Sequence, residues 1–160
     1  MKKLISYLSL YFVFCMLQFF FGRYINVCGI FPNFILIFVV YIGLSKGIIN
    51  AQLMGFLFGL IWDVFSTDIF GVRTVMFTVI GYLAGRFCRN FNREKIFTQV
   101  VIIFFAGAVY WLGFSLIYFI FPDNGNCVFS FSILSVSSKI VVTAVFAPIV
   151  FYILEKMDII

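Results

Sequence analysis

Apolar residues fill six long runs of this chain, separated by short connections that carry most of the polar side chains. The runs cover residues 4–21, 31–45, 48–65, 72–87, 96–121 and 129–154. Most are close to the ~20 residues that an α-helix needs to cross the ~30 Å hydrocarbon core of a bilayer. We therefore expect an all-α integral membrane protein, with residues 1–160 forming one compact bundle of six transmembrane helices, or five if one run does not cross.

The first two runs are the least regular. Residues 4–21 follow Lys2 and Lys3 as in a signal peptide, but the run is long and no small-residue cleavage site follows it, so we expect an uncleaved first helix. The second run starts near Pro32, which suits a first helical turn. At about 1.5 Å per residue it is short for a full crossing, and it is the run that decides between five helices and six.

The basic residues alternate along the chain in a way that predicts the topology. If both termini are cytoplasmic, most cations fall on the cytoplasmic side and only two, Arg23 and Arg73, on the outer side. The positive-inside rule favours this arrangement. We therefore expect a multi-pass membrane protein with both termini in the cytoplasm.

The composition argues against most soluble and catalytic classes. Hydrophobic residues make up 64% and charged residues 11%, whereas soluble domains carry about 25% charged residues. The chain has four cysteines without Cys-x-x-Cys spacing, no histidine and no nucleotide-binding loop, so we expect no metal, no cofactor, no catalytic residue and no nucleic-acid partner. Cys28 and Cys127 both fall on the expected outer side, and their pairing stays open.

Two Gly-x-x-x-Gly repeats stand in the middle of the chain, Gly55/Gly59 in the third run and Gly81/Gly85 in the fourth. Such spacing lets helix backbones approach closely within a membrane. Only the short connection 66–71, with Ser66 and Asp68 before Gly71, joins the two runs, so the helices should be antiparallel neighbours. We expect these five glycines to serve helix packing, either within the chain or with a partner.

A set of charges is expected at the outer end of the bundle. Asp63 continues the spacing of Gly55 and Gly59, and a carboxylate near hydrocarbon calls for a partner. Lys139 lies inside the last run, on one helical face with Ser132, Ser135 and Thr143. We expect Lys139 to lie near Asp63 or Asp68, forming with Arg73 an intramembrane or outer-edge cluster. The alternative is that Lys139 extends alone to the interface.

A second basic surface is expected on the cytoplasmic side, between the fourth and fifth runs. It interleaves cations with aromatic residues and consists of Arg86, Arg89, Arg93 and Lys95. Attraction to anionic lipid headgroups explains such a group, at about 1 kcal/mol per cation near the surface. Docking of a cytoplasmic protein is the other interpretation.

The order of these motifs resembles the MreD family. The resemblance rests on Pro32-Asn-Phe, Gly55-x-x-x-Gly59-x-x-x-Asp63, Gly71-Val-Arg73 and Gly81-Tyr. It implies a non-enzymatic membrane scaffold of the bacterial rod-shape (elongation) machinery, which regulates cell shape through lateral peptidoglycan synthesis. It also implies a bundle like the substrate-binding S components of energy-coupling-factor transporters.

The partners implied by the resemblance are MreC, bound directly, and MreB filaments, RodA and its transpeptidase, bound directly or through MreC. No small-molecule substrate is implied. The alternative is an S-component-like transporter subunit with a cavity near Asp63, Arg73 and Lys139. Those subunits dock through an Ala-x-x-x-Ala motif on the first helix, whereas residues 4–21 contain no alanine.

Overall fold

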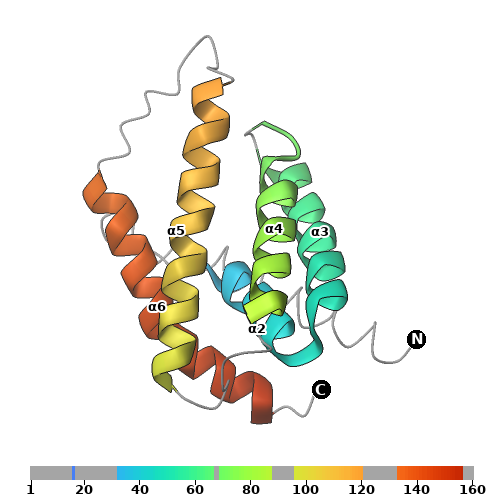
Figure 1. Cartoon of the computed structure of the whole chain (residues 1–160). Helices are drawn as coiled ribbons and strands as arrows, with labels where there is room; N and C mark the ends of the chain where they lie inside the picture. The colour runs from blue at the N-terminus through green and yellow to red at the C-terminus, as the bar shows by residue number, and fades with distance from the viewer. Residues whose placement is uncertain (1–15, 17–31, 67–68, 88–95, 121–132, 157–160) are drawn as a thin grey trace.

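The computed structural model describes residues 16, 32–66, 69–87, 96–120 and 133–156 of this chain. Within them the fold is all-α (Figure 1). The helices are α2 (Phe34–Lys46), α3 (Ile48–Phe65), α4 (Val72–Phe87), α5 (Ile96–Ile120) and α6 (Ile133–Lys156). Apart from Met16, the expected first helix at 4–21 lies outside the described residues. So do the possible pair Cys28 and Cys127 and the two chain termini.

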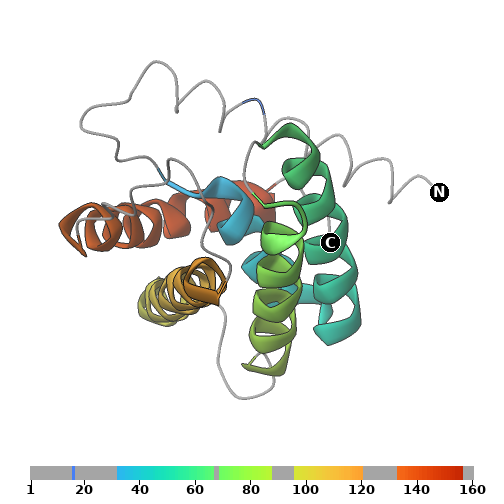
Figure 2. The same cartoon turned by 90° about the horizontal axis from the view of Figure 1, so that it is seen from above.

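Helix α2 forms the centre of the described bundle. Seen from above, α3 and α4 lie on one side of it and α5 and α6 on the other (Figure 2). Every residue from Phe34 to Leu44 is buried, as expected for a helix that is apolar around its whole circumference. Aromatic contacts fix it on both sides: Phe38 packs on Phe58 of α3 at 5.4 Å between ring centroids, and Tyr41 meets Phe151 of α6 edge-on at 5.1 Å.

Helices α3 and α4 form an antiparallel hairpin in backbone contact. A Cβ on Gly55 would collide with the carbonyl of Phe77, and one on Gly59 with the backbone of Thr74. From the other helix, a Cβ on Gly81 would lie 2.5 Å from the Ala51 carbonyl oxygen, and one on Gly85 2.5 Å from the Ile48 Cα. The two glycine tracks therefore lie one after the other along the contact, and each meets ordinary residues of the partner helix.

Helices α5 and α6 pack on each other and complete the described bundle. Helix α6 contains Pro148, which has no N–H to donate to the preceding turn, and such a residue kinks a helix. Its buried face, with Thr143, Ala144, Ala147 and Phe151, turns toward the core. Helix α5 is 25 residues long, and much of its outer surface is uncovered.

Three described helices are long and apolar enough to cross a membrane, at Ile48–Phe65, Ile96–Ile117 and Ser137–Lys156. Helix α2 has 13 residues, about 20 Å at 1.5 Å per residue, and is shorter than a crossing requires. The all-α class is therefore confirmed, and five helices are present in the described part. The sixth helix and the S-component-like arrangement stay predictions.

Candidate functional site

The carboxylate of Asp63 caps the first turn of α4 from the end of α3. Its Oδ2 accepts hydrogen bonds from the amides of Gly71 at 3.0 Å and Thr74 at 2.9 Å, and from the Thr74 hydroxyl at 2.6 Å. Its Oδ1 accepts from the amide of Arg73 at 3.3 Å. The first amides of a helix have no partner within the helix, and they carry the positive end of its dipole. The buried charge is thus satisfied mainly by backbone.

Gly71 explains why the cap comes from another helix. It directly precedes α4 and has a φ of +94°, a left-handed conformation that disfavours residues with a side chain. A glycine has no side-chain oxygen to accept hydrogen bonds from the free amides of the first turn. Asp63, eight residues earlier in the chain than Gly71, accepts these hydrogen bonds and thereby fixes the turn between α3 and α4.

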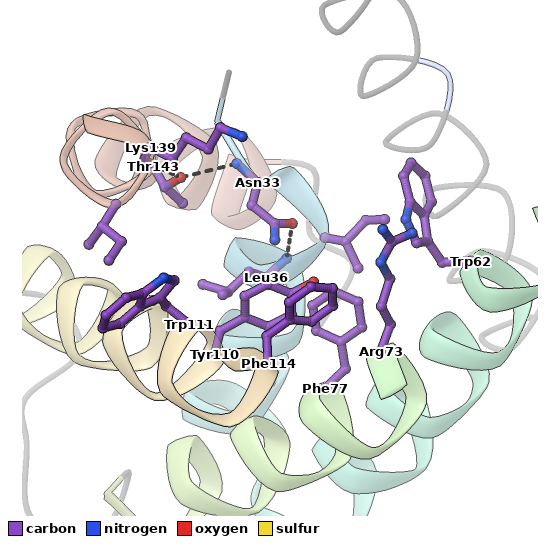
Figure 3. Close-up of a pocket in the computed structure, with 13 residues that line it drawn as sticks. Asn33, Leu36, Trp62, Arg73, Phe77, Tyr110, Trp111, Phe114, Lys139 and Thr143 are labelled. Carbon is purple, nitrogen blue, oxygen red and sulfur yellow. Dashed lines mark hydrogen bonds between the residues drawn. The ribbon is translucent and has the colours of Figure 1, made fainter. Parts of the chain in front are cut away.

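A pocket of about 240 Å³ lies beside this cap, where α2, α3, α4, α5 and α6 meet. Figure 3 shows its walls, with Arg73 and Trp62 on one side and Lys139 and Thr143 on the other. The described lining residues include two cations, Arg73 and Lys139, and no carboxylate. They are Asn33, Ile35, Leu36, Trp62, Arg73, Phe77, Gly107, Tyr110, Trp111, Phe114, Lys139, Ile140 and Thr143.

One wall of the pocket ties the start of α2 to α6. Asn33 caps α2, because its Oδ1 accepts from the Leu36 amide at 3.1 Å. The backbone amide of Asn33 donates to the Thr143 hydroxyl oxygen at 3.1 Å, and that hydroxyl donates to the backbone carbonyl of Lys139 at 2.7 Å. These bonds hold the backbone at Lys139 and Asn33 together, so the Lys139 side chain starts from a fixed point on the pocket wall.

The opposite wall is aromatic. Phe77 stacks on Tyr110 at 5.5 Å, and Tyr110 stacks on Phe114 at 5.9 Å, with interplanar angles of 23° and 21°. The Arg73 guanidinium lies 5.9 Å from the centre of the Trp62 ring, within the range of a cation–π contact. The pocket therefore combines cationic groups with a broad apolar surface.

Trp111 presents an unused donor in the same place. Its Nε1 atom is buried and has no hydrogen-bond acceptor in the described structure. In Figure 3 the indole nitrogen lies on the edge of the ring that is turned toward the interior of the pocket. A buried donor without an acceptor costs about 1–3 kcal/mol, so this N–H is a position where a bound acceptor would lower the free energy.

The structure places two of the expected charges in one pocket lining and gives a third other partners. Arg73 and Lys139 line the same pocket, whereas Asp63 is absent from its lining and directs both oxygens to α4. Asp68 and Ser132 lie outside the described residues, and the side chain of Ser135 is not described either. Gly55, Gly59, Gly81 and Gly85 lie between α3 and α4, and Gly71 forms the turn before α4.

The basic surface expected on the cytoplasmic side is described only at its first residue, Arg86. Arg86 Nη1 donates to the Tyr82 hydroxyl at 2.8 Å on an exposed face of α4. Arg89, Arg93 and Lys95 lie outside the described residues. Over the ranges that are described, no group of three His, Cys, Asp or Glu side chains is placed to hold a metal ion.

Sequence reasoning did not single out Asn33, Tyr110, Trp111 or Phe114 as site residues. The aromatic residues sit in long apolar runs, where nothing distinguishes a pocket wall from a surface that faces lipid. A signal existed for Asn33, because an asparagine directly before an apolar helix is a typical N-cap.

Comparison with known proteins completes the picture. Searches of curated proteins and of solved structures found no match for this chain. A family model described as rod shape-determining protein MreD matches residues 1–157 of the 160. This match covers nearly the whole chain and confirms the resemblance drawn from the glycine and aspartate motifs. The chain belongs to the MreD family of rod shape-determining membrane proteins.

Proposed function

We propose that this protein is a non-enzymatic scaffold in the bacterial cytoplasmic membrane that binds MreC through the outward face of α5. Its family gives it a role in rod-shape determination. In the proposed complex it connects MreC, and through it the MreB filaments, to RodA and its transpeptidase during lateral peptidoglycan synthesis. The single observation that carries the choice of face is the low burial of α5.

Helix α5 is covered far less than the other membrane-length helices. In the most apolar 18-residue stretch of α5 only 11% is buried, whereas the corresponding stretches of α3 and α6 are each 33% buried. Six of its exposed large side chains recur at intervals of three, four or eight residues, which places them along one face of the helix. They include Phe97, Val101, Phe104, Leu112, Leu116 and Phe119, and we call this set the α5 stripe.

The α5 stripe suits a transmembrane helix as its partner. Helices in lipid associate by van der Waals packing, and the large side chains on either side of Ala108 give ridges and a hollow for a second helix. The resemblance to MreD implies a bitopic MreC as the partner, so MreC offers one helix inside the membrane. The glycine tracks do not serve this contact, because α3 and α4 use them on each other.

The chemistry of the described residues supports a scaffold over an enzyme. The chain has no histidine, and the buried carboxylate of Asp63 accepts four hydrogen bonds from α4 and its connection. A general base needs a free lone pair directed at its substrate. Asp63 has a structural task instead, at the joint between α3 and α4.

The pocket beside Asp63 is the observation that favours the alternative, a small-molecule-binding subunit like the S components. Its volume of about 240 Å³ is below the roughly 300–1,000 Å³ of pockets that enclose a drug-sized ligand. A transporter subunit would also need a coupling surface for an ATPase module. We therefore keep the scaffold as the proposed function.

The test is to combine depletion with co-purification. Cells depleted of this protein should lose their rod outline, and MreC should co-purify with the tagged wild-type chain from solubilised membranes. A variant with Leu112→Ala and Leu116→Ala should lose MreC while keeping its abundance, because both side chains are 58–59% exposed and leave the core intact. Normal rods after depletion, or MreC retained by the variant, would refute the proposal.

A further inference from the structure

We propose that the pocket between α2 and the other four described helices binds an anionic amphiphile, with its phosphate group at Arg73 and Lys139 and its apolar part on the aromatic wall. This site is separate from the α5 stripe and does not depend on MreC. Three features of the lining lead to this ligand class: the sign of its charge, its unused donor and its mixed polarity.

The charge of the pocket selects an anion. Arg73 and Lys139 come from α4 and α6, and the described lining contains no carboxylate to oppose them. The nearby Asp63 has its oxygens occupied by three amides and a hydroxyl. Arg73 and Lys139 each make further interactions, and a bound anion would share the two cations with these neighbours. Lysine and arginine are the side chains that most often hold phosphate.

The indole N–H of Trp111 also favours a ligand with acceptor oxygens. The Trp111 Nε1–H is buried and lacks an acceptor among the described residues, and it lies on the pocket edge (Figure 3). An anionic headgroup has several acceptor oxygens, so the bound amphiphile can offer one acceptor to a cation and another to the indole. The site thus offers charge from two helices and a neutral donor from a third, α5.

The remaining lining selects an amphiphile over a fully polar ion. The stack of Phe77, Tyr110 and Phe114 and the aliphatic Ile35, Leu36 and Ile140 make most of the wall apolar. Val141, which follows the lining residue Ile140, is 50% exposed on α6, a helix long enough to span a membrane. Apolar surface suited to acyl chains therefore adjoins the pocket.

The volume fits a headgroup and the first part of a chain, not a whole lipid. The pocket volume of about 240 Å³ is below the roughly 300–1,000 Å³ of pockets that enclose a drug-sized ligand. A phosphate with a short glycerol unit is of this order. The same phosphate chemistry could come from a membrane phospholipid or from a soluble phosphate ester, and the experiment below separates these sources.

The chain carries its own reporter. Its two tryptophans are Trp62 and Trp111, and both line the pocket. Intrinsic fluorescence from the full-length protein therefore reads out this site without a label. Bromine atoms on lipid chains quench tryptophan only at contact range, so stronger quenching by one lipid than by another at the same mole fraction reports its enrichment beside these two tryptophans.

The experiment places the wild-type chain in nanodiscs of phosphatidylcholine and compares two quenchers at the same mole fraction, brominated phosphatidylglycerol and brominated phosphatidylcholine. The anionic lipid should occupy the pocket about fivefold more readily and therefore quench more, since about 1 kcal/mol from a cation near the headgroup is a factor of about five in affinity. Lys139→Gln should abolish the difference and Lys139→Arg should retain it. Lys156→Gln is the matched control, because Lys156 is on the same helix, exposed and remote from the pocket lining.

The soluble arm adds glycerol phosphate to nanodiscs of phosphatidylcholine alone. A saturable change in tryptophan emission that Lys139→Gln removes, with equal quenching by the two lipids, assigns the site to a soluble phosphate ester and supports the anion chemistry. Equal quenching with no response to glycerol phosphate overturns the proposal. A preference for phosphatidylglycerol that Lys156→Gln weakens as much as Lys139→Gln also overturns it, because general surface attraction would then explain the effect.

Discussion

Thr74 donates two hydrogen bonds to the Oδ2 atom of Asp63, one from its backbone amide at 2.9 Å and one from its hydroxyl at 2.6 Å. Both residues are buried, at 2% and 7% exposure. The contact joins the last turn of α3 to the first turn of α4, while Gly59 one turn earlier lets the backbones meet. The motif of two glycines and an aspartate thus acts as one joint between two helices.

Removing the carboxylate should damage this joint severely. Asp63→Ala leaves three amides and a hydroxyl without their acceptor, and we expect a loss of about 3 kcal/mol or more in the free energy of unfolding. Thr74→Val removes the hydroxyl alone and should cost about 1 kcal/mol. Thermal unfolding in detergent and protein abundance in the membrane measure both. Equal melting of Asp63→Ala and wild type would contradict the capping role.

The Asp63 cap also predicts how Asp63 and Lys139 behave together. If they formed an isolated ion pair, Lys139→Ala would rescue Asp63→Ala by removing the unpaired cation. Because the Asp63 oxygens bind the α4 amides, we expect the two losses of stability to add in the double variant. Abundance of the single and double variants, measured in the same membranes, decides this. Rescue would show that the charge pair is the main interaction.

The glycine contact predicts different tolerance at different glycines. Gly59→Ala and Gly85→Ala place a Cβ against helix backbone, which cannot move aside, so both should separate α3 from α4 and lower the melting temperature clearly. Gly107→Ala is the matched control, because its Cβ would meet the Ile140 side chain at 3.2 Å, and a side chain can shift. Similar melting of all three variants would show that close backbone approach is unimportant here.

The link between α2 and α6 predicts two losses of stability of similar size. Asn33→Ala removes the cap on the Leu36 amide, and we expect a loss of about 1 kcal/mol. Thr143→Val removes the acceptor of the Asn33 amide and should cost a similar amount while leaving the α2 cap in place. Thermal unfolding of both variants tests this. A Thr143→Val protein as stable as wild type would mean that the hydrogen bond between α2 and α6 does not contribute to stability.

The sequence predicts where the helices of this fold begin and end better than it predicts which helices pack against one another. The bounds of α3 and α4 coincide with the expected runs 48–65 and 72–87, because Lys46-Gly47 and the connection 66–71 mark their ends clearly. The all-round burial of α2 is invisible in sequence, since a membrane helix that faces lipid is equally apolar. Whether a run lies in the centre or at the edge depends on tertiary packing alone.

The candidate site shows the same division. The motif correctly marks Asp63 as a residue that needs partners, but its partners are backbone amides, which every sequence contains. The pocket draws on five helices and on residues as distant as Asn33 and Thr143. Periodicity describes one helix at a time, so it predicts Lys139 on a polar face and leaves the opposing residues undetermined.

The most direct test of the proposed scaffold is photo-crosslinking from two matched phenylalanines. Benzoylphenylalanine replaces Phe104 in the α5 stripe, 51% exposed, or Phe56 on the outer face of α3, 45% exposed, in cells that express tagged MreC. Both positions are exposed apolar sites on membrane-length helices, so lipid contact alone treats them alike. Crosslinking to MreC from position 104 and not from position 56 is the predicted result. Crosslinking from 56 alone, or equally from both, would contradict it.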